Sequence, residues 1–166
     1  MGENELLTAL TNAIRAEVEG HSFYLMAAKT TVDALGKQVF ERLAAEELDH
    51  AAFLRSQYDS IRESGTAAPV RLGIPAVPAG SPIFSADIRK RIAQAHFEMT
   101  ALSVGAQLEQ TAMTFYAAQA DTATDPEVAR FFRELADWER GHYRTLVAQL
   151  DSLREEFWAS NQFSPF

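Results

Sequence analysis

Apolar residues recur at alternating intervals of three and four in two long segments of the chain, and polar or charged residues fill most positions between them. This period is typical of a helix that buries one face in a bundle. One stripe lies within residues 33–64 and the other within residues 125–158. The inward positions are Phe40, Leu43, Glu47, His50, Leu54, Gln57 and Ile61 in the first stripe, and Phe132, Leu135, Glu139, His142, Leu146, Gln149 and Leu153 in the second.

The chain also repeats itself. When residues 9–63 are compared with residues 101–155, 19 of the 55 aligned pairs are identical. Unrelated sequences of this composition would share roughly three pairs, at ~6% chance identity. Two copies are too few for a solenoid and favour a domain with pseudo-two-fold symmetry. Each copy contributes two helices, and the first helix of each pair is predicted over residues 4–29 and 85–120.

The expected helix boundaries complete the fold prediction. Asp125 and Pro126 form a strong helix start, because the acid can cap the helix and proline fits its first turn. Residues 65–84 are rich in proline and glycine, so they cannot be helical throughout, and they are too long for a tight turn. The sequence therefore predicts an all-α, four-helix bundle in a single domain (residues 1–166). Its helix pairs at residues 4–64 and 85–158 are joined by a long crossover between helices 2 and 3.

Composition narrows the class of protein. The net charge of −8 argues against nucleic-acid binding, and no apolar run is long enough to span a membrane. The absence of cysteine excludes disulfides, iron–sulfur clusters and thiolate metal sites in these residues. The N-terminal residues lack the basic start and apolar stretch of a signal peptide, so a cytoplasmic location is expected.

Charged residues in the buried stripes carry the candidate chemistry. Glu-x-x-His occurs once in each copy, and the inward face of each first helix adds a glutamate. Four buried carboxylates with no lysine or arginine at their level would cost several kcal/mol each. Two divalent cations would balance them, as in di-iron and di-manganese bundles, where two helices give Glu and two give Glu-x-x-His. The predicted metal ligands are Glu17, Glu47, His50, Glu109, Glu139 and His142.

Simpler interpretations stay open for individual residues. A single Glu-x-x-His is usually a solvated helix face, and only the matched repeat makes a metal site the better hypothesis. Tyr24 and Tyr116 lie two turns beyond Glu17 and Glu109 on the same stripes, so we expect them to donate hydrogen bonds to the ligands, although they could be core aromatics. Glu46 is expected at the surface.

These motifs resemble the ferritin-like superfamily, and within it the rubrerythrin group in a form without the rubredoxin domain. The resemblance covers roughly residues 5–157 and implies a role for each predicted ligand. Glu17 and Glu109 would be terminal ligands, Glu47 and Glu139 would bridge two iron ions, and His50 and His142 would each bind one iron. The resemblance implies no catalytic residue beyond the metal ligands.

Two departures from the rubrerythrin pattern are visible. The cysteines of the rubredoxin domain are missing, and Ala112 stands where rubrerythrins carry an additional glutamate. The symmetric pair of histidines is closer to the ligand set of bacterioferritin. However, Leu48 replaces the haem-ligating methionine of that family, and the proline-rich crossover is unlike a cage-forming ferritin.

The leading functional hypothesis is a di-iron oxidoreductase that reduces hydrogen peroxide or dioxygen. The electrons would come from an external donor, either rubredoxin-like or a flavoprotein, because the chain has no second redox centre. One alternative is a ferroxidase or iron-storage protein, and another is a non-redox bundle that holds zinc or manganese. A homodimer is expected from the resemblance and from the aromatic tail at residues 157–166.

Overall fold

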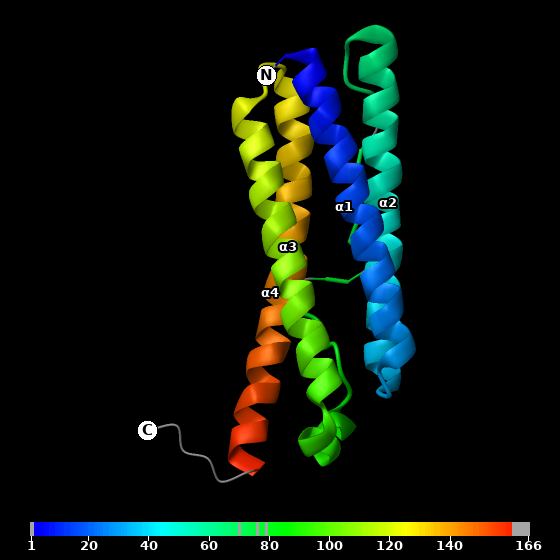
Figure 1. The fold of residues 1–166 in the computed structure, drawn as a ribbon. Helices are drawn as coiled ribbons and strands as arrows, with labels where there is room; N and C mark the ends of the chain where they lie inside the picture. Colours follow the sequence, from blue (N-terminus) through cyan, green and yellow to red (C-terminus); the bar gives the residue numbers. More distant parts are fainter. Residues whose placement is uncertain (1, 70, 76, 79, 161–166) are drawn as a thin grey trace.

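The computed structural model describes residues 2–69, 71–75, 77, 78 and 80–160. Its elements are α1 (Glu3–Thr30), α2 (Ala34–Ser64), the 3-10 helix η1 (Ala86–Gln94), α3 (His96–Thr122) and α4 (Pro126–Ser160). The described residues contain no strand, and the four long helices run side by side (Figure 1). The predicted all-α four-helix bundle is thus confirmed. The end of the aromatic tail, residues 161–166, lies outside the described residues.

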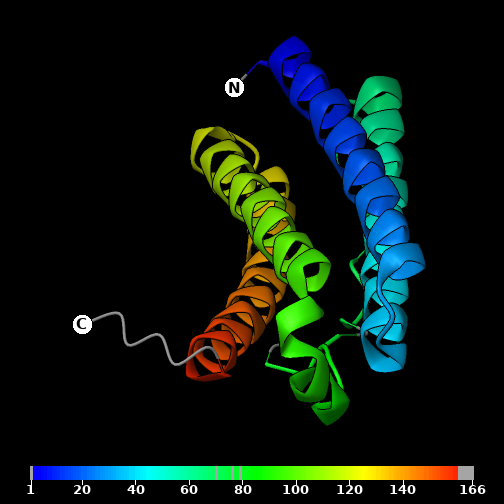
Figure 2. The same ribbon diagram turned by 60° about the horizontal axis from the view of Figure 1, so that its bottom comes forward.

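The bundle consists of two helix pairs, as the internal repeat predicts. Figure 2 shows α1 packed along α2 and α3 packed along α4. The apolar core is divided into two clusters. One contains Tyr24, Phe40 and Leu146, and the other contains Leu10 and Phe132. All the predicted metal ligands fall between these clusters in the sequence of each helix, so they form a polar layer across the middle of the bundle.

Local capping sets the ends of the helices. The Asp33 carboxylate accepts a hydrogen bond from the backbone N–H of Gly36 at 2.9 Å and so caps the start of α2. Gly65 ends α2 with a φ of 71°, a left-handed conformation that glycine adopts at little cost. At the start of α4, Asp125 accepts from the backbone N–H of Glu127 at 2.8 Å. The predicted boundaries at Gly65 and Asp125 are confirmed.

The start of the third helix differs from the prediction. We expected one helix from residue 85, but residues 86–94 form a 3-10 helix with a non-helical φ of −119° at Arg91, and α3 begins at His96. Side-chain packing explains the break, because Ile88 and Ile92 turn into the apolar core. Asp33 also holds the preceding Ser85, accepting from its hydroxyl at 2.5 Å.

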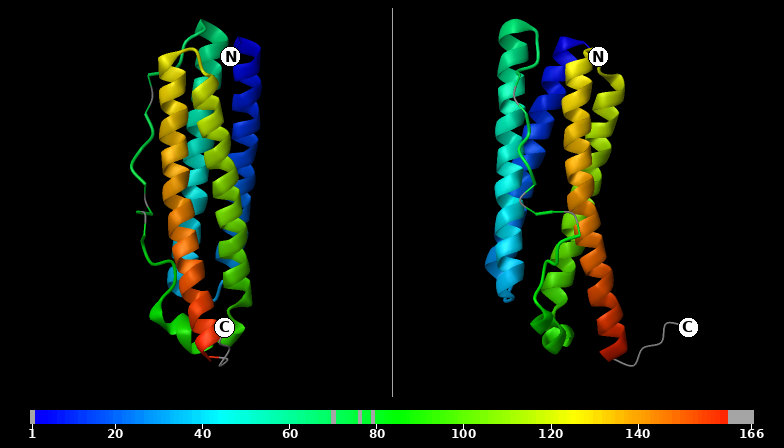
Figure 3. Two further views of the ribbon diagram at one scale, coloured as in Figure 1. Left: turned by 90° about the vertical axis from the view of Figure 1, so that its left-hand side faces the viewer. Right: turned by 180° about the vertical axis from the view of Figure 1, so that it is seen from behind.

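The crossover runs down the outside of the bundle beside α2 and α4 (Figure 3). Among its described residues, several backbone N–H groups donate to side chains of the helices, which replaces the pairing of regular secondary structure. Gln57 accepts from Ala68 (2.9 Å), Glu46 from Val77 (2.8 Å), Thr145 from Gly80 (2.8 Å) and Gln149 from Ile83 (3.0 Å). The crossover is therefore bound first to α2 and then to α4.

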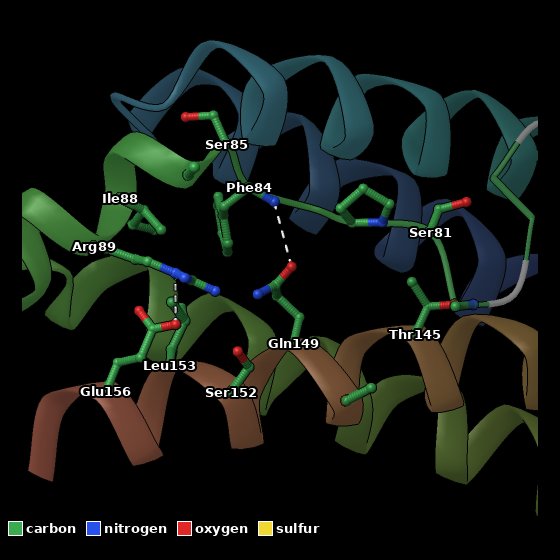
Figure 4. A pocket seen from close by; sticks show the side chains of 14 residues that line it. Ser81, Phe84, Ser85, Ile88, Arg89, Thr145, Gln149, Ser152, Leu153 and Glu156 are labelled. Atoms are coloured by element: carbon green, nitrogen blue, oxygen red, sulfur yellow. Dashed lines mark hydrogen bonds and ion pairs between the residues drawn. The ribbon is translucent and has the colours of Figure 1, made fainter. Parts of the chain in front are cut away.

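The end of the crossover forms a hollow of about 380 Å³ against α4 (Figure 4). Arg89 of η1 pairs with Glu156 across it at 2.8 Å. None of the predicted metal ligands lines this hollow, so it is separate from the polar layer. Among the helices of the described residues, none has the length and apolar character that crossing a bilayer demands.

Candidate metal centre

All four helices send acidic side chains into the polar layer. α1 and α3 each provide one glutamate, and α2 and α4 each provide a glutamate and a histidine one turn apart, because residues i and i+3 share a helix face. Each of these residues exposes at most 4% of its surface. The six residues brought together are Glu17, Glu47, His50, Glu109, Glu139 and His142.

The six side chains form two overlapping groups. One contains Glu17, Glu47, His50 and Glu139, and the other contains Glu47, Glu109, Glu139 and His142. Within each group, one ligand atom from every residue lies within 4.8 Å of the others. Glu47 and Glu139 belong to both groups. This is the arrangement that two neighbouring cations need when two carboxylates bridge them.

Several polar atoms in this layer are buried without a hydrogen bond from the described residues. They are Glu47 Oε1, His50 Nδ1, both carboxylate oxygens of Glu139, and His142 Nδ1. Their nearest partners are one another, because Nδ1 of His50 lies 2.9 Å and Nδ1 of His142 lies 3.3 Å from the Glu139 oxygens. Buried polar atoms without well-formed hydrogen bonds cost about 1–3 kcal/mol each. Each of these atoms is a potential metal ligand, and together they provide the oxygen and imidazole donors that iron, manganese and zinc accept. The residues therefore fit a pair of divalent cations.

Burial and the neighbouring charges of the layer shift the pKa values of its side chains. Burial and the charge of Glu139 raise the pKa of Glu109 to about 8, and burial with the charges of Glu109 and Glu139 raises the pKa of Glu47. Burial lowers the pKa of His50, but the nearby Glu139 outweighs it and raises this pKa to about 10. Protons thus compensate the carboxylates when no metal does so.

Both predicted tyrosines donate to a glutamate of the layer, but across the bundle. The Tyr24 hydroxyl of α1 donates to Glu109 of α3, and the Tyr116 hydroxyl of α3 donates to Glu17 of α1. The tyrosines thus donate to predicted ligands, as expected, and the partner of each lies on the facing helix. Gly105 permits the crossed arrangement, because a Cβ atom there would lie 3.2 Å from the Tyr24 hydroxyl.

Glu46 is buried, contrary to the surface position expected. Its carboxylate accepts from Nε2 of His142 at 2.8 Å, from the Trp138 indole at 2.7 Å and from the Val77 backbone at 2.8 Å. Burial raises the pKa of Glu46, but these hydrogen bonds and the imidazole outweigh it and lower the pKa, so the group stays ionised. A carboxylate on the far nitrogen of a ligating histidine fixes the ring and its tautomer.

The repeat contained a signal for this residue. Glu46 aligns with Trp138, and each directly precedes the Glu of a Glu-x-x-His motif. Each one also contacts the histidine of the other motif: Glu46 binds His142, and the Trp138 ring packs edge-on against His50 with 5.0 Å between ring centres. One aligned position is an acid and the other is an indole, so the two copies of the repeat must differ here. The sequence alone could have shown this difference.

A cavity of about 470 Å³ leads from solvent to the layer between α1 and α3. Glu17, Glu47 and Glu109 form part of its wall, and small residues such as Gly20 and Ala112 line it as well. A Cβ atom on Gly20 would lie 3.2 Å from Glu47 Oε2, so the absence of a side chain keeps this carboxylate open to the cavity. A small molecule can therefore reach three of the four inner carboxylates.

Comparisons with known proteins agree with this geometry. The family model described as Rubrerythrin matches residues 8–150. A solved structure of a hypothetical protein from Pyrococcus furiosus is 29% identical in sequence, with a TM-score of 0.59, and the match covers 90% of each chain. No curated protein matches the chain.

Proposed function

This chain belongs to the rubrerythrin family, and on that basis we propose that it is a di-iron oxidoreductase that reduces hydrogen peroxide or dioxygen with electrons from an external donor. The observation that carries the proposal is the pair of ligand groups that share Glu47 and Glu139 in a buried layer. We assign Glu47 and Glu139 as bridging ligands. Glu17 with His50, and Glu109 with His142, would complete the two positions.

Two bound Fe²⁺ ions would supply the two electrons that, with two protons, convert one hydrogen peroxide molecule into two waters. The protein's own contribution is to hold the ligands and to limit access. Tyr24 and Tyr116 orient the terminal carboxylates, and the two apolar clusters close the layer above and below. The cavity between α1 and α3 is wide enough for either oxidant.

Electrons must return to the iron from outside the described residues. The chain has no cysteine, so it holds no thiolate-bound redox centre of its own. We propose a rubredoxin-like protein or a flavoprotein as the donor, and a homodimer as the assembly. Turnover of peroxide should therefore require an added reductase and stop after one equivalent per iron pair without it.

The decisive experiment is to load metal-free protein with Fe²⁺ under anaerobic conditions and to add one equivalent of hydrogen peroxide. We expect two iron ions per chain and the ultraviolet absorption of a ferric pair. Failure to bind iron would reject the metal site. Iron that binds but resists oxidation by both peroxide and dioxygen would reject the redox function and favour a structural zinc or manganese site.

An iron-handling or ferroxidase function is the second candidate, because the access cavity is itself lined by acidic groups. Glu19 lies on the cavity together with three inner carboxylates, which suits the passage of a cation. This function predicts a large assembly that accumulates many irons per chain. Size-exclusion chromatography combined with iron analysis separates the two, because a small oligomer with two irons per chain excludes a storage shell.

A further inference from the structure

The two proposed metal positions have different surroundings on the far side of their histidines. Nε2 of His142 is hydrogen-bonded to the carboxylate of Glu46 at 2.8 Å. Nε2 of His50 is buried, and no described residue gives it a hydrogen bond. The two rings are otherwise equivalent by the repeat and lie stacked with 6.3 Å between their centres. The clearest difference between the far sides of the two rings is therefore the carboxylate of Glu46 at His142.

The far side of His50 faces a second cavity of about 360 Å³, separate from the one between α1 and α3. It lies between α2 and the crossover, and its walls include His50, Trp138 and Ile74. The Trp138 indole packs edge-on against the His50 ring, but its N–H donates to Glu46 and not to His50. The His50 ring is thus positioned by packing, without a carboxylate on its far nitrogen.

We propose that the two metal positions are unequal, that the position at His142 is filled first and more tightly, and that Glu46 is the positioning residue that makes it so. A carboxylate on Nε2–H increases the basicity of Nδ1 and fixes the ring toward the metal, and loss of such a partner typically lowers metal affinity about 10- to 100-fold. The inference rests on the proposed metal binding. It goes beyond that function because it assigns an order of loading and a residue that controls it.

Glu46 also binds the crossover through Val77, so a control must separate this role from its contact with His142. Gln57 provides this matched control. It lies on the same helix, accepts a crossover backbone N–H from Ala68 at 2.9 Å and touches none of the predicted ligands in the hydrogen bonds described. Gln57→Leu should loosen the crossover without changing the histidine.

The test is a titration of metal-free protein with Co²⁺, followed by its optical absorption. In the wild type we expect two binding steps separated by at least about tenfold in affinity. Glu46→Leu should weaken the tighter step at least about tenfold and leave the weaker step unchanged. Glu46→Gln keeps an acceptor oxygen but removes the charge, so the affinity of the tighter step should fall by less than in Glu46→Leu. Gln57→Leu should leave both steps unchanged.

A second readout identifies the ion that binds first. With one equivalent of Co²⁺, the paramagnetically shifted imidazole N–H signal should exchange slowly with water, since Glu46 shields the Nε2–H of His142. Equal binding steps in the wild type, a fast-exchanging first signal, or equal losses in the Glu46 and Gln57 variants would overturn the inference. If Glu46→Leu does not fold, an unchanged tighter step in Glu46→Gln overturns it. Absence of any Co²⁺ binding would instead reject the metal site itself.

Discussion

Two tyrosine hydroxyls connect the helix pairs at the level of the polar layer. Tyr24 is fully buried and donates to Glu109, and Tyr116 donates to Glu17 from the opposite direction. Each bond joins α1 to α3, which otherwise border the access cavity. The terminal carboxylates are therefore oriented by the facing helix, and a change in one helix pair is transmitted to a ligand of the other.

A double-mutant cycle tests the crossed pairing. Tyr24→Phe and Glu109→Gln should show a coupling of about 0.5–3 kcal/mol in the free energy of unfolding, because the two side chains share a hydrogen bond. Tyr24→Phe and Glu17→Gln should be additive within about 0.5 kcal/mol. Urea unfolding of the metal-free variants measures both. Coupling of Tyr24 to Glu17 instead would show that each tyrosine serves its own helix.

Glu139 is the residue whose loss should affect both metal positions, since it belongs to both ligand groups. Glu139→Gln keeps the size of the side chain and removes its charge, so we expect at most one iron per chain in place of two. Iron analysis after anaerobic loading and desalting measures the change. Glu155→Gln, at an exposed position of the same helix, is the control and should retain two irons. Two irons in Glu139→Gln would contradict the bridging assignment.

The six ligand candidates could be predicted because helical period alone decides which residues share a face. Glu47 and His50 must lie one turn apart on one side of α2, whatever the rest of the chain does. Glu46 could not be predicted in this way. Its burial depends on the crossover, whose Val77 covers it from a segment 31 residues away. The signal that the sequence offered for Glu46 was its alignment with Trp138 in the internal repeat.

The crossover is an irregular segment, and its conformation depends on contacts with residues far away in the sequence. The sequence predicted its position, because proline and glycine exclude a continuous helix. It also placed the end of the crossover at residue 84, but it did not predict that residues 86–94 form a 3-10 helix, in which Ile88 and Ile92 are buried. The predicted single helix over residues 85–120 did not include the break at Ala95, which separates η1 from α3.

At Gly36 the crossover lies close against α2, and this position supplies a test of the contact. A Cβ atom at this position would lie 2.4 Å from the Phe84 ring. Gly36→Ala should therefore displace Phe84 and lower the free energy of unfolding by about 1–3 kcal/mol. Gly73→Ala is the matched control, since nothing lies within 4 Å of its Cβ position, and it should change stability by less than about 0.5 kcal/mol. Equal effects in urea unfolding would contradict the close contact.

The molecule as a whole is a bundle whose apolar core is interrupted by a charged layer. The two apolar clusters contain the large aromatic and aliphatic side chains that hold the helices together, and the layer between them contains the proposed ligands. An interrupted core is less stable than a continuous one unless the charges are compensated. Without metal, protons on Glu109 and on the histidines provide the compensation, so the stability of the bundle is linked to pH.

The direction of this dependence follows from the shifted pKa values. Glu109 has a pKa of about 8 in the folded protein, against its ordinary value of 4.5, so the folded state holds a proton that the unfolded state has released. The pKa of His50 is about 10, against 6.5, so its contribution is present below pH 6.5 and is lost as the pH rises through 10. Both groups make the metal-free bundle less stable as the pH rises from 5 to 9.

Bound metal should reverse this trend, because a divalent cation replaces the protons and binds more tightly as the ligands lose them. We expect the free energy of unfolding of the metal-free protein to fall by at least about 1 kcal/mol between pH 6 and 8. A shift of one pKa unit corresponds to about 1.4 kcal/mol, so less than one unit is enough for this fall. The stabilisation by Zn²⁺, which is redox-inactive, should increase over the same range. Urea unfolding at pH 5, 7 and 9, with and without Zn²⁺, measures both, and Glu109→Gln should flatten the metal-free curve. Metal-free stability that rises with pH would mean that the carboxylates of the layer are already compensated by other groups.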